Sequence, residues 1–159
     1  MAIGAEPQGV LIQRDIYFRA RHGRLKLREE EGAQAHLIAY ERPDRSGQRE
    51  SRYRLVMVEK ADEIKAALAA TLGVEAVVAK ERRLLIWEGV RIHLDRVDRL
   101  GHFVEFEAPT NSKGADTSGA EARVERLRRA LEIEPDALVA GSYCDLVLAL
   151  PGREAVERA

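Results

Sequence analysis

The sequence predicts an α+β fold in which an antiparallel sheet carries two or three helices packed outside it. Apolar and polar residues alternate along most of the first 107 residues, as in strands, and two segments switch to a helical period. Several strands also carry two or more charges on one face, opposite apolar neighbours. If the sheet curls with its helices outside, that charged face lines the lumen of a β-barrel or tunnel. An open sheet with the charged face in water is the alternative, and the periodicity alone favours neither.

The first part of the chain reads as strands joined by turns. Residues 24–28 alternate strictly between basic residues and leucine, so Lys26 and Arg28 share one face of their strand. Turn residues flank this segment at Gly23 and after Glu29. We expect strands at residues 15–18, 24–28, 35–42 and 51–58.

The period changes after residue 60. Ile64, Leu68 and Leu72 recur every four residues and Gly73 follows them, which predicts a helix over residues 61–72. A similar apolar stripe predicts a second helix over residues 118–131. The apolar residues 142–150 fit either a strand or a helix. Further strands are expected at residues 76–82, 84–88, 90–97 and 103–107.

Composition narrows the class of protein. The 26 basic and 27 acidic residues nearly cancel, which argues against a nucleic-acid or membrane-surface binder. A single cysteine excludes an internal disulfide, and the chain shows neither a signal peptide nor an apolar run of membrane-spanning length. We therefore expect a cytoplasmic protein with one domain over residues 10–150 and flexible termini at 1–9 and 151–159.

The charged faces supply the candidate binding residues. Lys26 with Arg28 and Lys80 with Arg82 each stand two residues apart, so a curled sheet would present rows of cations suited to an oligo-anion. Glu105 and Glu107 have the same spacing. Two carboxylates on one face suit a hard cation such as Mg²⁺, which prefers oxygen ligands and often bridges to phosphate.

One histidine stands out as a candidate for proton transfer. His93 shares a strand face with Asp95, which makes the two a candidate catalytic pair for general acid and base chemistry. The alternative is that His93 only forms a hydrogen bond in the wall of the sheet. Cys144 has no histidine pattern behind it, and a buried structural thiol is the better interpretation.

The same segments resemble the CYTH domain family, in particular its class IV adenylate cyclase branch. The resemblance begins at Gln13 and covers nearly all of the chain after it. It implies an antiparallel, eight-stranded closed tunnel that binds triphosphates or related organic phosphates through basic residues and one or two divalent metal ions. The matching segments, in family order, are Gln13-Arg-Asp-Ile-Tyr-Phe18, Gly23-Arg-Leu-Lys-Leu-Arg-Glu29, Leu37-Ile-Ala-Tyr-Glu-Arg-Pro43, Val78-Ala-Lys-Glu-Arg82, Ile92-His-Leu-Asp-Arg-Val97, Leu100-Gly-His-Phe-Val-Glu-Phe-Glu107 and Ser142-Tyr-Cys-Asp-Leu146.

The resemblance also assigns roles by position. It implies that Glu105 and Glu107 bind Mg²⁺ or Mn²⁺ and that Asp95 helps to order the metal site. One departure is that no Glu-x-Glu-x-Lys strand, with which family members normally open, precedes Gln13. The positions matching phosphate-binding residues are Lys26, Arg28, Arg42, Lys80 and Arg82.

Three functions remain open at this point. The first is an enzyme that binds a nucleoside triphosphate, thiamine triphosphate or polyphosphate and cleaves a phosphate anhydride by hydrolysis or cyclisation. The second is a lyase or cyclase that acts without metal on a small anionic metabolite. The third is a non-catalytic protein that binds such an anion. The absent opening strand would leave a sheet edge for a second subunit to cover, which favours a homodimer.

Overall fold

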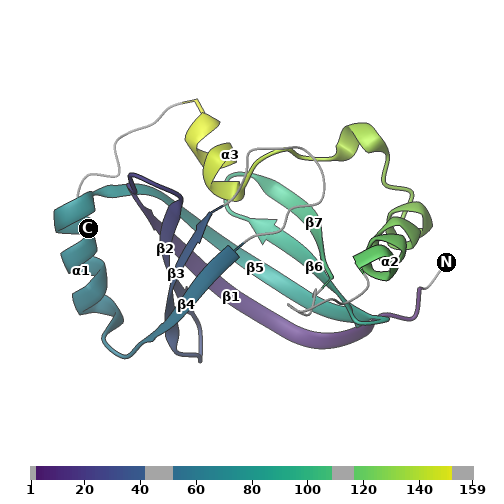
Figure 1. Ribbon diagram of the computed structural model, residues 1–159, viewed down its shortest axis with the longest axis horizontal. Coiled ribbons are helices and arrows are strands. Elements are labelled where there is room, and N and C mark those ends of the chain that lie inside the picture. Colours follow the sequence, from purple (N-terminus) through teal and green to yellow (C-terminus); the bar gives the residue numbers. More distant parts are fainter. Residues whose placement is uncertain (1–2, 42–51, 109–116, 152–159) are drawn as a thin grey trace. The chain divides into compact units, whose positions relative to one another are not determined.

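The structure, a computed structural model, describes residues 3–41, 52–108 and 117–151. Within them, seven strands form one antiparallel sheet in the order β4-β3-β2-β1-β5-β6-β7 (Figure 1). The α+β class and the antiparallel sheet are thus confirmed. No pairing of β4 with β7 closes the sheet within these residues. The elements are β1 (Glu6–Phe18), β2 (Arg24–Glu30), β3 (Ala35–Glu41), β4 (Arg52–Val58), α1 (Ala61–Leu72), β5 (Val74–Trp87), β6 (Val90–Val97), β7 (Gly101–Glu107), α2 (Thr117–Ala130), the 3₁₀ turn η1 (Pro135–Ala137) and α3 (Tyr143–Ala149).

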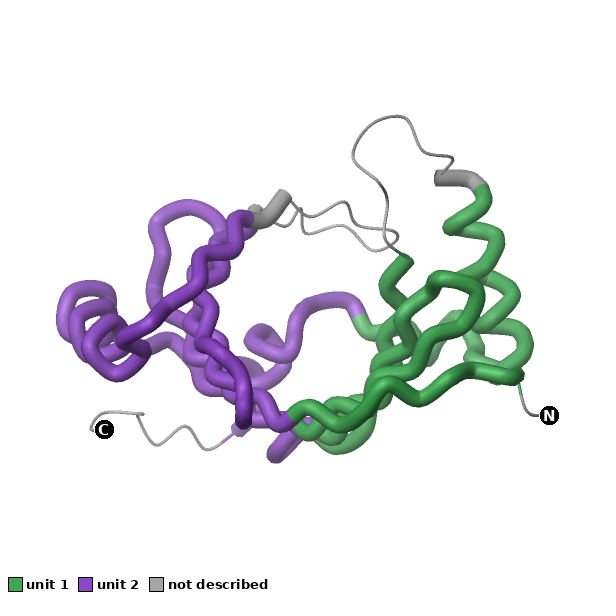
Figure 2. Tube along the Cα trace, turned by 90° about the horizontal axis from the view of Figure 1, so that it is seen from below, with its two compact units in different colours: residues 1–11, 81–96, 101–139 green, residues 12–80, 97–100, 140–159 purple. Residues whose placement is uncertain are grey.

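The chain divides into two compact units, coloured separately in Figure 2. Unit 1 contains residues 1–11, 81–96 and 101–139, and unit 2 contains residues 12–80, 97–100 and 140–159. The neighbouring strands β1 and β5 contribute residues to both. Each unit has its own apolar core and its own cluster of charged side chains.

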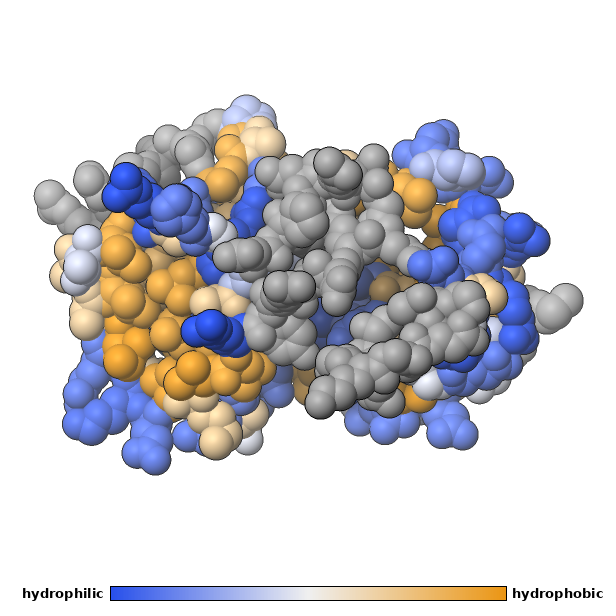
Figure 3. All heavy atoms as spheres, viewed as in Figure 1, coloured by the Kyte–Doolittle hydropathy of each residue, from blue (hydrophilic) through white to orange (hydrophobic). Residues whose placement is uncertain are grey.

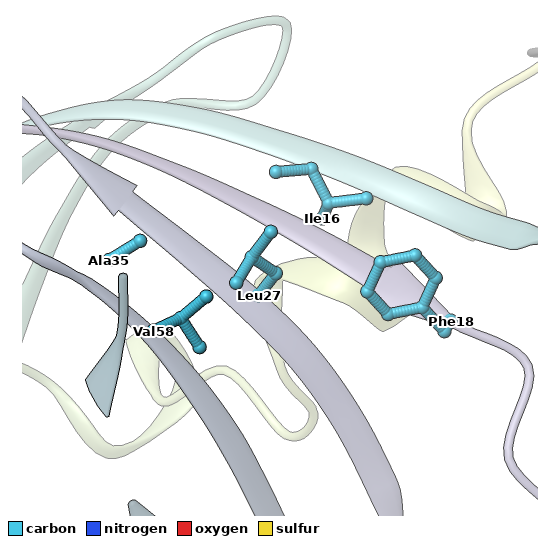
Figure 4. Packing of buried hydrophobic residues seen from close by; sticks show 5 residues of the cluster. All are labelled: Ile16, Phe18, Leu27, Ala35 and Val58. Atoms are coloured by element: carbon cyan, nitrogen blue, oxygen red, sulfur yellow. The ribbon is translucent and has the colours of Figure 1, made fainter. Parts of the chain in front are cut away.

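The core of unit 2 lies on the apolar face of β1 and β2. Ile16 pairs with Leu27 across these strands, and Leu27 pairs in turn with Leu37 of β3. Figure 4 shows Ile16, Phe18, Leu27, Ala35 and Val58, the buried residues of this core. Leu68 and Leu72 of α1 pack against them. Because strand side chains alternate, the opposite face of the same strands carries the polar residues.

Unit 2 also exposes apolar surface on its edge strand. Leu55, Val56 and Met57 of β4 are each more than half exposed, and Ile64 of α1 is also exposed. Figure 3 shows hydrophobic residues gathered on the part of unit 2 around α1.

The core of unit 1 joins β6 to α2. Val90 and Ile92 pack with Leu127 of α2, and Trp87 and Phe106 border them. The alternating pattern of β6 then breaks, because His93 and Asp95 are 5% and 2% exposed whereas Leu94 is 43% exposed. From His93 to Asp95 the charged side chains are therefore the buried ones.

Some elements differ from their sequence-based prediction. β1 starts at Glu6, whereas the alternation predicted its start at Asp15, and the two strands expected at 76–82 and 84–88 are one continuous strand, β5. β1 and β5 are neighbours in the sheet. Hydrogen bonds to neighbouring strands stabilise the extended backbone even where apolar and polar residues do not alternate. The ambiguous segment 142–150 contains the helix α3, which begins with a capping box between Ser142 and Asp145. No helix within the described residues is long and apolar enough to cross a bilayer.

Candidate functional site

A buried carboxylate organises the basic residues of unit 2. Asp15 is 1% exposed and accepts a hydrogen bond of 2.7 Å from Lys26 Nζ. Arg28 donates two more, from Nε to Oδ1 and from Nη2 to Oδ2, both at 2.7 Å. The register of β1 and β2 brings these side chains together, since Asp15 lies opposite Arg28 and Tyr17 lies opposite Lys26. Residues opposite each other in an antiparallel pair point to the same side of the sheet.

Lys80 joins this cluster from β5, the strand next to β1. It is 7% exposed, and its charge helps to lower the pKa of Asp15. Its Nζ lies 5.1 Å from the centre of the Tyr143 ring, within the range of a cation–π contact. We call Asp15, Lys26, Arg28 and Lys80 the basic cluster.

The start of α3 places Tyr143 beside Lys80. Ser142 and Asp145 cap this helix reciprocally, through Asp145 N–H to Ser142 Oγ and Ser142 N–H to Asp145 Oδ2. Arg24 of β2 donates to Asp145 at 2.5 Å, which ties the helix to the sheet. The helix cap and the contact between Arg24 and Asp145 thus fix the position of the segment that carries Tyr143.

Ionisation in the basic cluster is set by burial and by charge. Burial alone would raise the pKa of Asp15, but the hydrogen bond from Arg28 and the charges of Lys26 and Lys80 outweigh it, so the pKa falls well below 3.8. Asp15 is therefore ionised throughout the physiological range. Two ammonium groups and one guanidinium thus lie around the Asp15 carboxylate.

Tyr17, which contacts Lys26, stays protonated. Burial, and then the charge of Asp15, raise the pKa of Tyr17 far above its ordinary value. Lys26 Nζ lies 5.3 Å from the centre of this ring and 5.9 Å from that of Tyr40, and it donates to the Tyr17 hydroxyl at 3.4 Å. Nearby, burial raises the pKa of Cys144 to about 11, so its thiol is not an ionised nucleophile near neutral pH.

Unit 1 has a charged cluster of its own, centred on Arg82. This side chain donates to both oxygens of Asp95, at 2.7 and 2.6 Å, and to Glu105 at 2.9 Å. Arg82 and Asp95 are both buried, whereas the side chain of Glu105 is 49% exposed. The guanidinium thus links a buried carboxylate to one that solvent or a ligand can reach.

His93 lies close to both predicted metal-binding carboxylates. Its Nδ1 is 3.4 Å from Glu105 Oε2 and its Nε2 is 3.7 Å from Glu107 Oε2. Arg91 also contacts Glu107, at 3.2 Å. Among the described residues, no group of three or more His, Cys, Asp or Glu side chains is arranged to hold a metal ion. Both separations are longer than the roughly 2.6–3.2 Å at which a positioned side chain transfers a proton directly.

The structure thus sorts the predicted site residues into two clusters, one in each unit. Unit 2 brings together Lys26, Arg28 and Lys80. Arg42 lies outside the described residues. Unit 1 brings together Arg82, His93, Asp95, Glu105 and Glu107.

Sequence reasoning missed Asp15 within the basic cluster, and Gln13 and Tyr143 beside it. For Asp15 and Gln13 a signal existed, because they alternate with Arg14 and Ile16 on a strand that faces the basic residues of β2. Tyr143 carried no periodic signal, because a helix of seven residues is too short to show one.

The chain is similar to one protein family and to several solved structures. The family model described as CYTH domain matches residues 2–143. A structure of a protein from Pyrococcus horikoshii OT3 is similar with a TM-score of 0.79 at 21% identity, covering 91% of this chain and 87% of that one. A conserved hypothetical protein from Pyrococcus furiosus gives a TM-score of 0.78 at 19% identity, with 91% and 88% covered.

A third similar structure carries a functional name. It is a protein from Vibrio parahaemolyticus with the provisional name adenylate cyclase, at a TM-score of 0.67 and 20% identity, covering 91% of this chain and 85% of that one. A search of the curated proteins found no match. At these identities the structural likeness shows the fold alone.

Proposed function

The chain belongs to the CYTH domain family, and from this membership we propose that it is an enzyme acting on a phosphorylated small molecule. The reaction we infer is cleavage of a phosphate anhydride, by hydrolysis or by cyclisation. The observation that carries the proposal is the basic cluster, in which Lys26, Arg28 and Lys80 surround the buried Asp15. The provisional name of the Vibrio relative agrees with this reaction class.

Phosphate suits the basic cluster better than a monoanionic metabolite does. Lys26, Arg28 and Lys80 all act on one small region around Asp15, so an anion with several charges gains more from them than one with a single charge. Guanidinium groups can bind phosphate in a bidentate way. Lys26 and Lys80 are 9% and 7% exposed, so solvent screens their charges weakly. A triphosphate or polyphosphate is the ligand class that these charges favour.

Catalysis in this proposal depends on position and charge. Lys26, Arg28 and Lys80 hold the phosphates and stabilise the negative charge that develops as the anhydride bond breaks. The nucleophile is water in a hydrolysis, or a hydroxyl of the substrate in a cyclisation, and the leaving phosphate departs in line. Because the pKa of Tyr17 is raised, its hydroxyl acts as a hydrogen-bond donor and not as the base.

The carboxylates of unit 1 fit a hard divalent cation in part. Glu105 and Glu107 offer oxygen ligands and are about half exposed, so water can supply the remaining coordination. We infer that these two residues would hold Mg²⁺ or Mn²⁺. When bound, such an ion neutralises charge on phosphate oxygens.

One observation favours a second function, an acid–base lyase or cyclase that needs no metal. Glu105 already contacts Arg82 and His93, and Glu107 already contacts Arg91. A cation would have to compete with these three groups for the carboxylates. In this alternative, His93 exchanges a proton with a small anionic substrate while Arg82 binds its charge.

Calorimetric titration and product analysis separate these functions. The probes are ATP, thiamine triphosphate and tripolyphosphate, each with and without Mg²⁺. The proposed enzyme binds at least one of them and turns it over with a dependence on metal. Binding without turnover indicates a non-catalytic anion-binding protein. Failure to bind any polyphosphate contradicts the proposal and favours the metal-free alternative.

A further inference from the structure

A buried amide oxygen beside the basic cluster has no hydrogen-bond donor. Gln13 of β1 is 4% exposed, and its Nε2 donates to Glu30 Oε2 at 2.6 Å. Its Oε1 is buried and finds no donor among the described residues. Buried polar atoms in native structures nearly always have a partner, and leaving one unmet is costly. The oxygen therefore marks a place where a donor is expected to bind.

The strand register places Gln13 on the same side of the sheet as the basic cluster. Gln13 lies two residues before Asp15 on the same strand, about 7 Å along it, and the two side chains point to the same side of the sheet. Gln13 lies opposite Glu30 on β2, and Asp15 lies opposite Arg28. A ligand whose phosphates contact Lys26 and Arg28 can thus reach Gln13 with a neighbouring group.

The groups at Gln13 accept hydrogen bonds, whereas the cations of the basic cluster donate them. An amide oxygen and the carboxylate of Glu30 both accept hydrogen bonds, and neither attracts a phosphate. This end of the strand pair suits an N–H or O–H group. The face therefore offers two subsites in sequence, one for an anion and one for a hydrogen-bond donor.

We propose that Gln13 is a specificity-determining residue whose Oε1 accepts a hydrogen bond from the organic part of the ligand. This inference rests on the proposed function and narrows its substrate class. The ligand is an organic phosphate that carries an amino or hydroxyl group near its phosphates. Inorganic tripolyphosphate, which lacks such a group, occupies the basic cluster without engaging Gln13.

The test compares an organic and an inorganic polyphosphate in one variant. Gln13→Leu removes the acceptor and keeps the side chain close to its original volume. We expect it to weaken binding of whichever of ATP and thiamine triphosphate the wild-type protein binds more tightly, by about tenfold in Kd, as for a lost hydrogen bond. Tripolyphosphate affinity should stay within about twofold. Gln34→Leu, at an exposed glutamine of the same unit, is the matched control and should change neither affinity.

A second variant keeps the proposal testable if Gln13→Leu does not fold. Gln13→Asn keeps an amide but withdraws the oxygen by one methylene, and it should reduce the preference for the organic phosphate in the same direction. Undiminished tripolyphosphate binding shows that either variant is folded. Equal effects on both ligands, no effect on either, or a wild-type protein that binds only tripolyphosphate would overturn the role of Gln13 and leave the proposed function standing. A wild-type protein that binds no polyphosphate overturns both.

Discussion

Asp15 and Arg28 face each other across β1 and β2, and the guanidinium of Arg28 donates 2.7 Å hydrogen bonds to both oxygens of the Asp15 carboxylate. Lys26 donates a third hydrogen bond to the same carboxylate. The pairing holds two cations on the polar face of the sheet. It also gives the basic cluster a counter-charge whose removal has measurable consequences.

The first prediction concerns Asp15→Asn. Removing this charge leaves Lys26 and Arg28 without their buried carboxylate, and breaking a buried ion pair from one side costs about 3 kcal/mol. We expect the free energy of unfolding in urea to fall by about that amount. Tripolyphosphate should restore more stability to the variant than to the wild-type protein, since it replaces the lost negative charge.

Asp62→Asn is the matched control for this variant. Asp62 pairs with Lys65 on the exposed surface of α1, where the ion pair is worth little. We expect no measurable change in its unfolding curve. A loss of stability equal to that of Asp15→Asn would contradict a special role for the buried pair.

The second prediction concerns acid pH. The pKa of Asp15 is lowered in the folded protein, so its contribution to stability is complete above the unfolded value near 3.8 and is lost as pH falls toward the folded value. The stability difference between wild-type protein and Asp15→Asn should therefore be constant from pH 7 to about 5 and shrink below pH 4. Urea unfolding at several pH values measures it. A difference that grew on acidification would contradict this sign.

The third prediction concerns the contact between Tyr143 and Lys80. Tyr143→Leu removes the ring that lies 5.1 Å from the ammonium group, an interaction worth about 0.5–2 kcal/mol. We expect tripolyphosphate affinity to fall by about threefold to tenfold, because Lys80 is less well positioned. Tyr143→Phe retains the ring and should lose less. Equal losses in the two variants would show that the hydroxyl, and not the ring, matters.

The fourth prediction separates metal-assisted from acid–base catalysis. In the proposed enzyme, Glu105→Gln and Glu107→Gln each lower turnover by about 10- to 100-fold, and excess Mg²⁺ partly offsets the loss. His93→Gln instead leaves the response to Mg²⁺ unchanged.

Glu81→Gln, which alters a partly exposed carboxylate paired with Arg96 in unit 1, serves as the control and should behave as wild type. Turnover that survives a chelator but disappears in His93→Gln would support the metal-free alternative.

Sequence periodicity predicted the elements whose two faces differ most in polarity. β2 alternates leucine with basic residues, and its leucines do face the core of unit 2 while Lys26 and Arg28 face Asp15. Pattern alone could not say which face of a strand is buried. In β6 the charged residues His93 and Asp95 are buried and Leu94 is exposed, and this reverses the usual rule.

The residues around the predicted cations were harder to find. A lone aspartate on a strand resembles a surface residue, and its role follows only from a register that brings Arg28 and Lys26 to it. The orphaned oxygen of Gln13 is a property of packing and leaves no trace in the sequence. The family resemblance supplied the positions of Lys80 and Arg82, whose pattern alone did not distinguish a binding row from a solvated face.

The affinity of the protein for tripolyphosphate, compared between wild type and Lys80→Met, tests the central claim most directly. Lys65→Met, at a surface lysine of α1 that pairs with Glu29, is the reference substitution. Calorimetry should show at least tenfold weaker binding for Lys80→Met and wild-type binding for Lys65→Met. Equal dissociation constants in all three proteins would show that phosphate binds elsewhere, and would contradict the account.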